Sequence, residues 1–139
     1  MLITFTVPGA PQGKGRPRIG KVGAHARMFT PAKTVAYEGL VAHAAQVAMD
    51  GRPPIDAACR CVVSIMLPIP ASWSQKKQRE AQAGIIRPTT KPDTDNVVKA
   101  LFDGMNGVVW RDDVLCVDVH AAKYYHSTPH VDVHVEVLR

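Results

Sequence analysis

Hydrophobic and polar residues alternate along four short stretches of the chain. They are residues 2–7, 59–67, 115–121 and 131–137. Side chains of a strand point in turn to opposite faces of its sheet, so a period of two is typical of strands with one buried face. The pattern therefore predicts a sheet of about four half-buried strands.

Three other stretches have the spacing of helices. The first begins at Thr30-Pro31, which supplies an N-cap residue and a proline at the first helical position, and continues to about residue 48. The second, residues 72–83, is short and polar and is closed by Gly84. The third, residues 95–105, has an apolar stripe and stops at Asn106-Gly107. We expect its apolar stripe to be buried.

Nothing divides the 139 residues into smaller units. There is no repeat, linker or low-complexity tract, and this length can bury a core without disulfides. The sequence therefore predicts one α+β domain over residues 1–139, a two-layer structure in which a mixed or antiparallel sheet packs against helices. Cys59 and Cys61 alternate in a strand-like stretch and are expected to be reduced core thiols of a cytoplasmic protein. Neither a signal peptide nor a membrane span is expected.

The segment of residues 12–27 is rich in Gly, Lys and Arg and has no hydrophobic period. We expect an irregular basic loop, because such a sequence cannot bury apolar surface of its own. Its positive side chains are candidates for contacts with the phosphates of a nucleic acid, and simple surface charge is the alternative. The candidate residues are Lys14, Arg16, Arg18 and Arg27.

Carboxylates are concentrated at two places in a chain whose formal net charge is +5. One is Asp93-Thr94-Asp95, and the other is Asp112-Asp113. A basic surface attracts polyanions, and carboxylate oxygens hold Mg²⁺. This combination predicts a Mg²⁺-dependent enzyme that acts on a polyanion.

The predicted elements place these acidic residues near a helix start. Pro92 disfavours helix in the residue before it, so Asp93 and Asp95 should lie where a loop enters a helix. Lys99 follows Asp95 by one helical turn. Asp112-Asp113 lies in a predicted turn and could close a metal site from the other side.

Purely structural roles remain open for the same residues. An aspartate at a helix start often caps the helix or interacts with its dipole. Lys99 could form an ion pair along its helix with Asp95 or Asp103, which would contribute a few tenths of a kcal/mol. The six histidines show no metal-binding spacing, and we assign none of them to catalysis.

The residues around this cluster closely resemble the RusA family of Holliday junction resolvases. The similarity includes the Asp-x-Asp-Asn start at Asp93, the lysine at position 99, the Asp-Gly-Met-Asn-Gly helix end, and the Asp112-Asp113 turn before a strand. Residues 5–18, and Phe29-Thr-Pro before a helix, are similar to the opening of the phage-type members. The resemblance covers most of the chain.

The resemblance implies a homodimeric endonuclease that binds four-way DNA junctions and cuts two strands symmetrically. By position, Asp93, Asp95 and Asp113 match the metal-binding aspartates, Asp112 is the weaker match of its pair, and Lys99 matches the catalytic lysine. The implied cofactor is Mg²⁺, with Mn²⁺ as a possible substitute. Neither a nucleotide cofactor nor a membrane is expected as a partner.

Two other classes of function are compatible with parts of the sequence. Asp93-Thr-Asp-Asn-Val97 superficially matches the nucleophile motif of haloacid-dehalogenase-type phosphatases, but an apolar strand does not precede it. A binding module that recognises DNA junctions without cutting them is the other alternative. Metal-dependent strand cleavage would separate the nuclease from the binding module.

Overall fold

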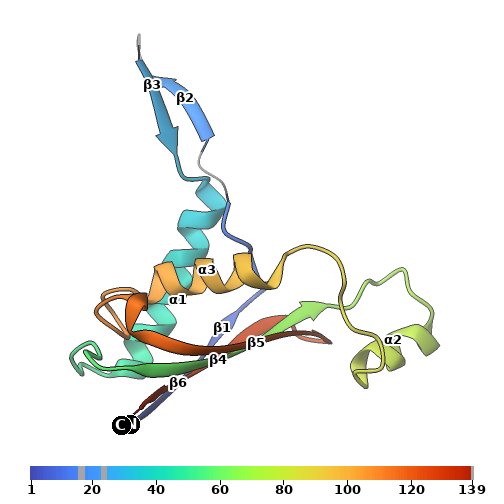
Figure 1. The fold of residues 1–139 in the computed structure, drawn as a ribbon. Coiled ribbons are helices and arrows are strands. Elements are labelled where there is room, and N and C mark those ends of the chain that lie inside the picture. Colours follow the sequence, from blue (N-terminus) through green and yellow to red (C-terminus); the bar gives the residue numbers. More distant parts are fainter. Residues whose placement is uncertain (16–17, 23–24, 139) are drawn as a thin grey trace.

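The computed structural model of the protein describes residues 1–15, 18–22 and 25–138. Within these ranges the chain forms a four-stranded sheet, a separate two-stranded hairpin and three α-helices. Helices α1 and α3 lie over the same face of the sheet, and α2 stands beyond one end of it (Figure 1). The predicted α+β class, with about four strands in one mixed sheet, is confirmed.

The sheet has the strand order β1-β6-β4-β5, which makes β5 an edge strand. β6 pairs antiparallel with both β1 and β4, and β4 pairs parallel with β5. A parallel pair needs a long crossover connection, and residues 69–115 supply it with α2 and α3. The strands are β1 (Leu2–Pro8), β4 (Cys59–Pro68), β5 (Cys116–His126) and β6 (His130–Val137).

The predicted alternation is confirmed in β1, β4 and β6, where every second side chain faces the helices and is buried. Val133 shows the result across the sheet, since it lies opposite Phe5 on one side and Val63 on the other. Each fully buried aliphatic side chain of this kind stabilises the fold by about 1.5–3 kcal/mol. Cys59 and Cys61 are free thiols in this core, and burial raises the pKa of Cys59 to about 11.

Helices α1 (Ala32–Met49) and α3 (Thr94–Met105) complete the core and touch each other closely. At Gly104 of α3, a Cβ atom would lie 2.8 Å from the carbonyl oxygen of Glu38 and 2.8 Å from Cβ of Val41. Only glycine lets the two helices approach to this distance. α1 starts one residue later than predicted, with Pro31 rather than Thr30 at the N-cap.

The basic segment contains more regular structure than its sequence predicted. β2 (Arg18–Val22) and β3 (His25–Phe29) pair antiparallel and form a hairpin that projects away from the sheet and helices (Figure 1). The predicted irregular loop over residues 12–27 is therefore wrong for this part. Backbone hydrogen bonds can join two short strands without any alternation of apolar side chains. Such a hairpin therefore has no hydrophobic period by which its sequence could be recognised.

The prediction of a half-buried strand over residues 115–121 is also wrong at its beginning. β5 starts at Cys116, and Val117 and Val119 are 64% and 45% exposed. The helical layer does not cover this part of the sheet edge. A period of two shows which side chains share a face, but it does not show whether another layer covers that face.

Helix α2 (Gln75–Gln82) is shorter than predicted and starts at the N-cap residue Ser74. The Ser74 hydroxyl oxygen accepts a hydrogen bond of 3.2 Å from the backbone N–H of Lys77. Gly84 follows the helix with a φ of 81°, a conformation in which glycine is favoured. Among the described residues, no helix has both the length and the apolarity needed to cross a membrane.

Candidate functional site

The N-terminal end of α3 presents two carboxylates that the fold does not use. Asp93 occupies the N-cap position, yet its side chain makes no capping hydrogen bond. Asp95 follows in the first turn, and both residues are exposed. Capping is therefore not the role of the Asp93 side chain, which leaves its oxygens available to a ligand.

Lys99 lies one turn further along α3 and is exposed as well. It forms no ion pair with Asp95 or Asp103, so the structural role considered for it from the sequence is wrong. Asp103 pairs instead with Lys14, at a nitrogen-to-oxygen distance of 2.9 Å. The Lys99 side chain, one turn after Asp95, is thus not engaged by either carboxylate.

A lysine of β5 holds the segment that leads into this site. The Lys123 ammonium group donates hydrogen bonds to the carbonyl oxygens of Thr90, at 2.9 Å, and Pro92, at 3.2 Å. Arg87 in turn donates from Nε to the carbonyl oxygen of Lys123 at 2.7 Å. These bonds fix the approach to Asp93 beside the second half of β5.

Lys123 is a positioning residue that the sequence predictions missed. It lies on the same side of its strand as Val119 and Ala121, since alternate residues share a face. A lone charged residue on the apolar side of a strand is unusual, and this signal could have found it.

A polar cleft of about 700 Å³ adjoins the start of α3. One wall is formed by residues 11–14 and the other by residues 91–93 and Asn96. The backbone N–H of Lys14 donates to the carbonyl oxygen of Asn96 at 3.0 Å, which ties the two walls together. Gly15 comes next, and a Cβ atom there would lie only 2.6 Å from Oγ1 of Thr34.

The third predicted metal ligand, Asp113, lies at the opposite end of α3. It begins the short 3₁₀ helix η1 (Asp113–Leu115), and its carboxylate accepts a hydrogen bond of 3.4 Å from Nδ2 of Asn106. Asn106 directly follows α3, whose 12 residues span about 18 Å. One copy of the chain therefore brings Asp93 and Asp95 together but keeps Asp113 apart from them.

The described part of the chain accordingly contains no group of three or more His, Cys, Asp or Glu side chains placed to hold one metal ion. Asp112, the weaker candidate of its pair, is the N-cap residue of η1, and its side chain is exposed. The assignment of the metal ligands remains a prediction.

Comparison with known proteins identifies the family. The family model described as "Endodeoxyribonuclease RusA" matches residues 8–136. The chain belongs to the RusA endodeoxyribonuclease family. It is also similar to a Bacillus subtilis (strain 168) protein named "Uncharacterized protein YqaN", with 38% identity over 135 residues, which are 94% of this chain and 93% of that protein.

The match to the RusA family includes both ends of α3 and the basic segment. In that segment, Lys14 is only 19% exposed, and its ammonium group also pairs with Glu38 at 2.8 Å. The hydrogen bond to Glu38, followed by the influence of Asp103, raises the pKa of Lys14 above its usual value. Lys14 thus holds the segment to α1 and α3, and its predicted contact with DNA stays untested.

Two of the other three predicted DNA contacts belong to the projecting hairpin. Arg18 lies in β2 opposite Phe29, and Arg27 lies in β3 opposite Gly20. Arg16 lies outside the described residues. Contact of these residues with DNA also remains a prediction.

Proposed function

We propose that this member of the RusA family is a Mg²⁺-dependent endodeoxyribonuclease that resolves four-way DNA junctions by symmetrical paired nicks, in DNA recombination and repair. The observation that supports it best is the set of unused groups at the start of α3, in a chain whose family is one of endodeoxyribonucleases. The reaction would be hydrolysis of a phosphodiester bond.

The residues at the start of α3 suit a hard divalent cation. Asp93 and Asp95 offer carboxylate oxygens, which Mg²⁺ prefers, and both side chains are exposed to solvent. Bound Mg²⁺ would supply charge neutralisation at the phosphate and a water of lowered pKa. The two aspartates would hold the ion, and its remaining positions would be left for water and substrate oxygens.

The chain's own groups would orient the phosphate and stabilise developing charge. The first backbone N–H groups of α3 have no partners within the helix and favour an anion at this end. The Lys99 ammonium group would neutralise negative charge that increases on the phosphate oxygens and the leaving oxygen. Both contributions depend on the exposure of this helix end.

A homodimer would supply the third carboxylate. The free beginning of β5 exposes Val117 and Val119, and Val114 beside it is 68% exposed. An edge strand with unpaired backbone groups and exposed valines is a template for pairing with another strand. We take a second copy of the same strand as its partner, paired antiparallel about a two-fold axis.

This pairing would bring the separated acidic residues together. With the axis at Val119, the start of one β5 lies opposite the end of the other. Asp113 of the partner subunit would then come close to Lys123, the residue whose ammonium group holds the chain at Pro92. Asp93 is the next residue after Pro92 in the chain. Each of the two sites would thus combine Asp93, Asp95 and Lys99 of one copy with Asp113 of the partner subunit.

The two other classes of function fit the geometry less well. A phosphatase of the haloacid-dehalogenase type needs its nucleophile at the end of a parallel strand. Asp93 instead follows a loop and begins a helix. A junction-binding module without cleavage would leave unexplained why Asp93 and Asp95, exposed carboxylates that repel phosphates, are followed by Lys99 one helical turn later.

The proposal is tested by strand cleavage of a labelled four-way DNA junction and of a linear duplex of the same sequence. Each substrate is incubated with Mg²⁺ and with EDTA, and the Asp95→Asn variant is run beside the wild type. We expect paired symmetrical nicks only in the junction, only when Mg²⁺ is present and only when Asp95 is intact. Tight junction binding without nicks would favour the binding module, and hydrolysis of a small phosphomonoester would favour the phosphatase.

A further inference from the structure

Positive charge is concentrated in two segments of the sequence, one of which includes the β2–β3 hairpin and the other α2. Residues 12–29 carry five Lys and Arg and no Asp or Glu, and residues 68–92 carry five Lys and Arg and one Glu. The remaining residues carry seven Lys and Arg against eleven Asp and Glu, which is a net charge of −4. The field of these remaining residues therefore directs a polyanion toward the two segments.

The second segment, residues 68–92, is called the α2 lobe here. In Figure 1 it stands beyond the end of β4, away from the β2–β3 hairpin, and the chain leaves it to enter α3. The start of α3, with Asp93 and Asp95, thus comes directly after the lobe in the chain. The polar cleft at that helix end is shared by Lys91 of the lobe and by Lys14 of the other segment.

The lobe is held in place by contacts with β5 and is not simply a charged loop in solvent. The Trp73 and Tyr125 rings pack edge to face with centroids 5.2 Å apart, and the Lys77 ammonium group lies 4.0 Å from the Trp73 centroid. The guanidinium of Arg87 lies 4.0 Å from the Tyr124 centroid. These aromatic contacts anchor the lobe to the second half of β5.

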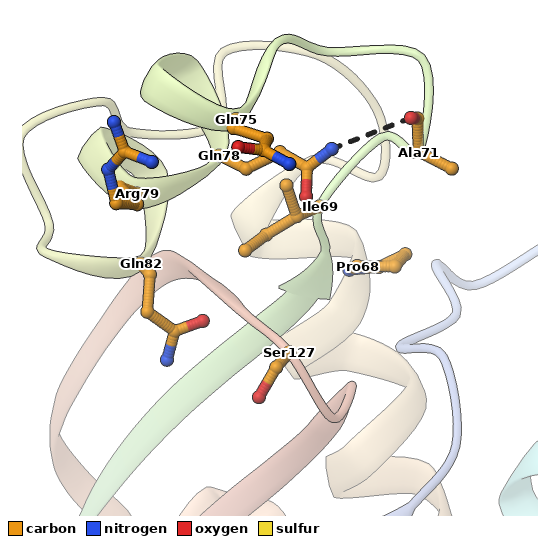
Figure 2. Close-up of a pocket in the computed structure, with 8 residues that line it drawn as sticks. All are labelled: Pro68, Ile69, Ala71, Gln75, Gln78, Arg79, Gln82 and Ser127. Carbon is orange, nitrogen blue, oxygen red and sulfur yellow. Dashed lines mark hydrogen bonds between the residues drawn. The ribbon is translucent and has the colours of Figure 1, made fainter.

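Two positive groups of α2 remain free to meet a ligand. The Lys76 side chain is 83% exposed, and its distance of 4.0 Å from Glu80 allows at most a weak, solvent-screened pair. Arg79, one turn further along, is also exposed. It helps to line a cleft of about 540 Å³ between α2 and the turn at Ser127 (Figure 2).

The same cleft offers amide groups beside the charges. Gln75, Gln78 and Gln82 come from α2, and Pro68 and Ile69 add apolar surface (Figure 2). Gln78 donates to the carbonyl oxygen of Trp73 at 2.8 Å. The side-chain amides of Gln75 and Gln82 make no hydrogen bond with the described residues. Amide and guanidinium donors of this kind are common partners of phosphate and sugar oxygens.

We propose that the α2 lobe is a DNA-binding surface that holds one duplex arm of a branched DNA, while the other segment meets another. The proposal rests on the proposed function, because it takes branched DNA as the substrate. Two segments rich in Lys and Arg, whose backbones project in different directions, can both be met by arms that diverge from a branch point. A linear duplex cannot follow both directions, so the lobe would contribute to selectivity for the junction.

The test is a binding titration of a labelled four-way junction and a linear duplex at a series of KCl concentrations. It uses Asp95→Asn protein, so that the DNA stays intact, with and without the further changes Lys76→Gln and Arg79→Gln. Loss of two phosphate contacts should make the slope of log affinity against log salt shallower by about 1.8. We expect junction affinity to fall on the order of tenfold, while duplex affinity changes by less than about twofold.

Two control variants separate charge from structure. Lys76→Arg with Arg79→Lys keeps both charges and should bind the junction like the parent protein. Arg52→Gln removes one positive charge at the end of α1, where the side chain donates to the carbonyl oxygens of Met49 and Ala48, and should leave the preference for the junction unchanged.

Unchanged junction affinity in the double variant, or an equal loss for both DNAs, would overturn the role of the lobe and leave the nuclease proposal standing. If the Asp95→Asn parent prefers the junction but the wild-type protein does not cut it, the nuclease proposal is overturned and the role of the lobe stands. A parent protein without any preference for the junction would overturn the role of the lobe as well.

Discussion

The two ends of α3 show how one helix separates chemistry from stability. At its start, Asp93, Asp95 and Lys99 are exposed and make no contacts that the fold requires. At its end, Met105 and Trp110 are fully buried, and the Trp110 ring nitrogen donates to Oδ1 of Asn106 at 2.8 Å.

The difference between the two ends predicts which substitutions change activity and which change stability. Removing an exposed carboxylate at the start costs the fold little, because the carboxylate has no partner among the described residues. Changes near the packed end lose contacts or create clashes, because interiors are close-packed. Activity and stability should therefore respond to substitutions at different ends of the same helix.

The largest effect is expected for Asp95→Asn. Loss of a charged metal ligand should slow junction cleavage by about a thousandfold, equal to about 4 kcal/mol of transition-state stabilisation. Junction binding should be equal or tighter, since a charge that repels phosphate is removed. Single-turnover cleavage and thermal unfolding measure the two effects.

Asp50→Asn is the matched control for that substitution. Asp50 ends α1 in the left-handed conformation with a φ of 50°, which asparagine also tolerates. Cleavage should be unchanged. A wild-type rate in the Asp95→Asn protein, or an equal loss in both variants, would contradict the role of Asp95.

Mixing Asp95→Asn and Asp113→Asn proteins would sharpen the comparison of the two helix ends. If each site takes Asp113 of the partner subunit, a mixed dimer has one intact site and one doubly altered site. An equal mixture should then recover about a quarter of the wild-type nicking rate, because half of the dimers are mixed. The nicking rate of the mixture is measured after subunit exchange and is compared with the rate of each variant by itself.

No recovery, with subunit exchange shown independently, would mean that each site takes all its residues from one chain. A Val119→Cys variant tests the proposed pairing separately, because cysteines at the proposed two-fold axis should cross-link under oxidation. Val47→Cys places a thiol at a more exposed valine, in α1, and should not cross-link.

Gly104→Ala should destabilise the protein by about 2 kcal/mol, since the new methyl group must displace α1 at Glu38 and Val41. Gly39→Ala is the control in α1, where a Cβ atom meets nothing within 4 Å. That change should stabilise the protein by about 0.5–1 kcal/mol. Equilibrium denaturation measures both. Equal effects of the two substitutions would contradict the close contact between the helices.

The smallest effect concerns Lys14, whose replacement by Met should cost about 1 kcal/mol by leaving Glu38 and Asp103 unpaired. The pKa of Lys14 is raised in the folded protein above 10.5, chiefly by its hydrogen bond to Glu38. Its stabilising effect is therefore fully present below pH 10.5 and is lost as the pH rises through the raised pKa.

Denaturant unfolding at neutral pH and above pH 10.5 should show this as a shrinking difference between wild type and Lys14→Met. Lys33→Met, at an exposed lysine of α1, corrects for general effects of alkaline pH. A difference that stays constant across the range would argue against the ion pairs of Lys14.

Local patterns predicted most of the elements but not their surroundings. The alternation at residues 2–7, 59–67 and 131–137 was confirmed because the helices cover one face of these three strands. The same alternation misled at Val117 and Val119, because the helices do not cover the start of β5, whereas they cover β1 at the other edge of the sheet. Strand order is set by contacts between distant segments, and a short sequence window carries no information about it.

The candidate site shows the same division. Its side chains could be predicted from the sequence, since the Asp-x-Asp start, the lysine one turn later and the apolar stripe that forms α3 are all local features. The fold was needed to show that Lys123 anchors the approach to Asp93 and that Asp113 lies at the far end of the helix. Local spacing fixes which side chains share a turn, whereas chain reversal and packing fix which distant side chains meet.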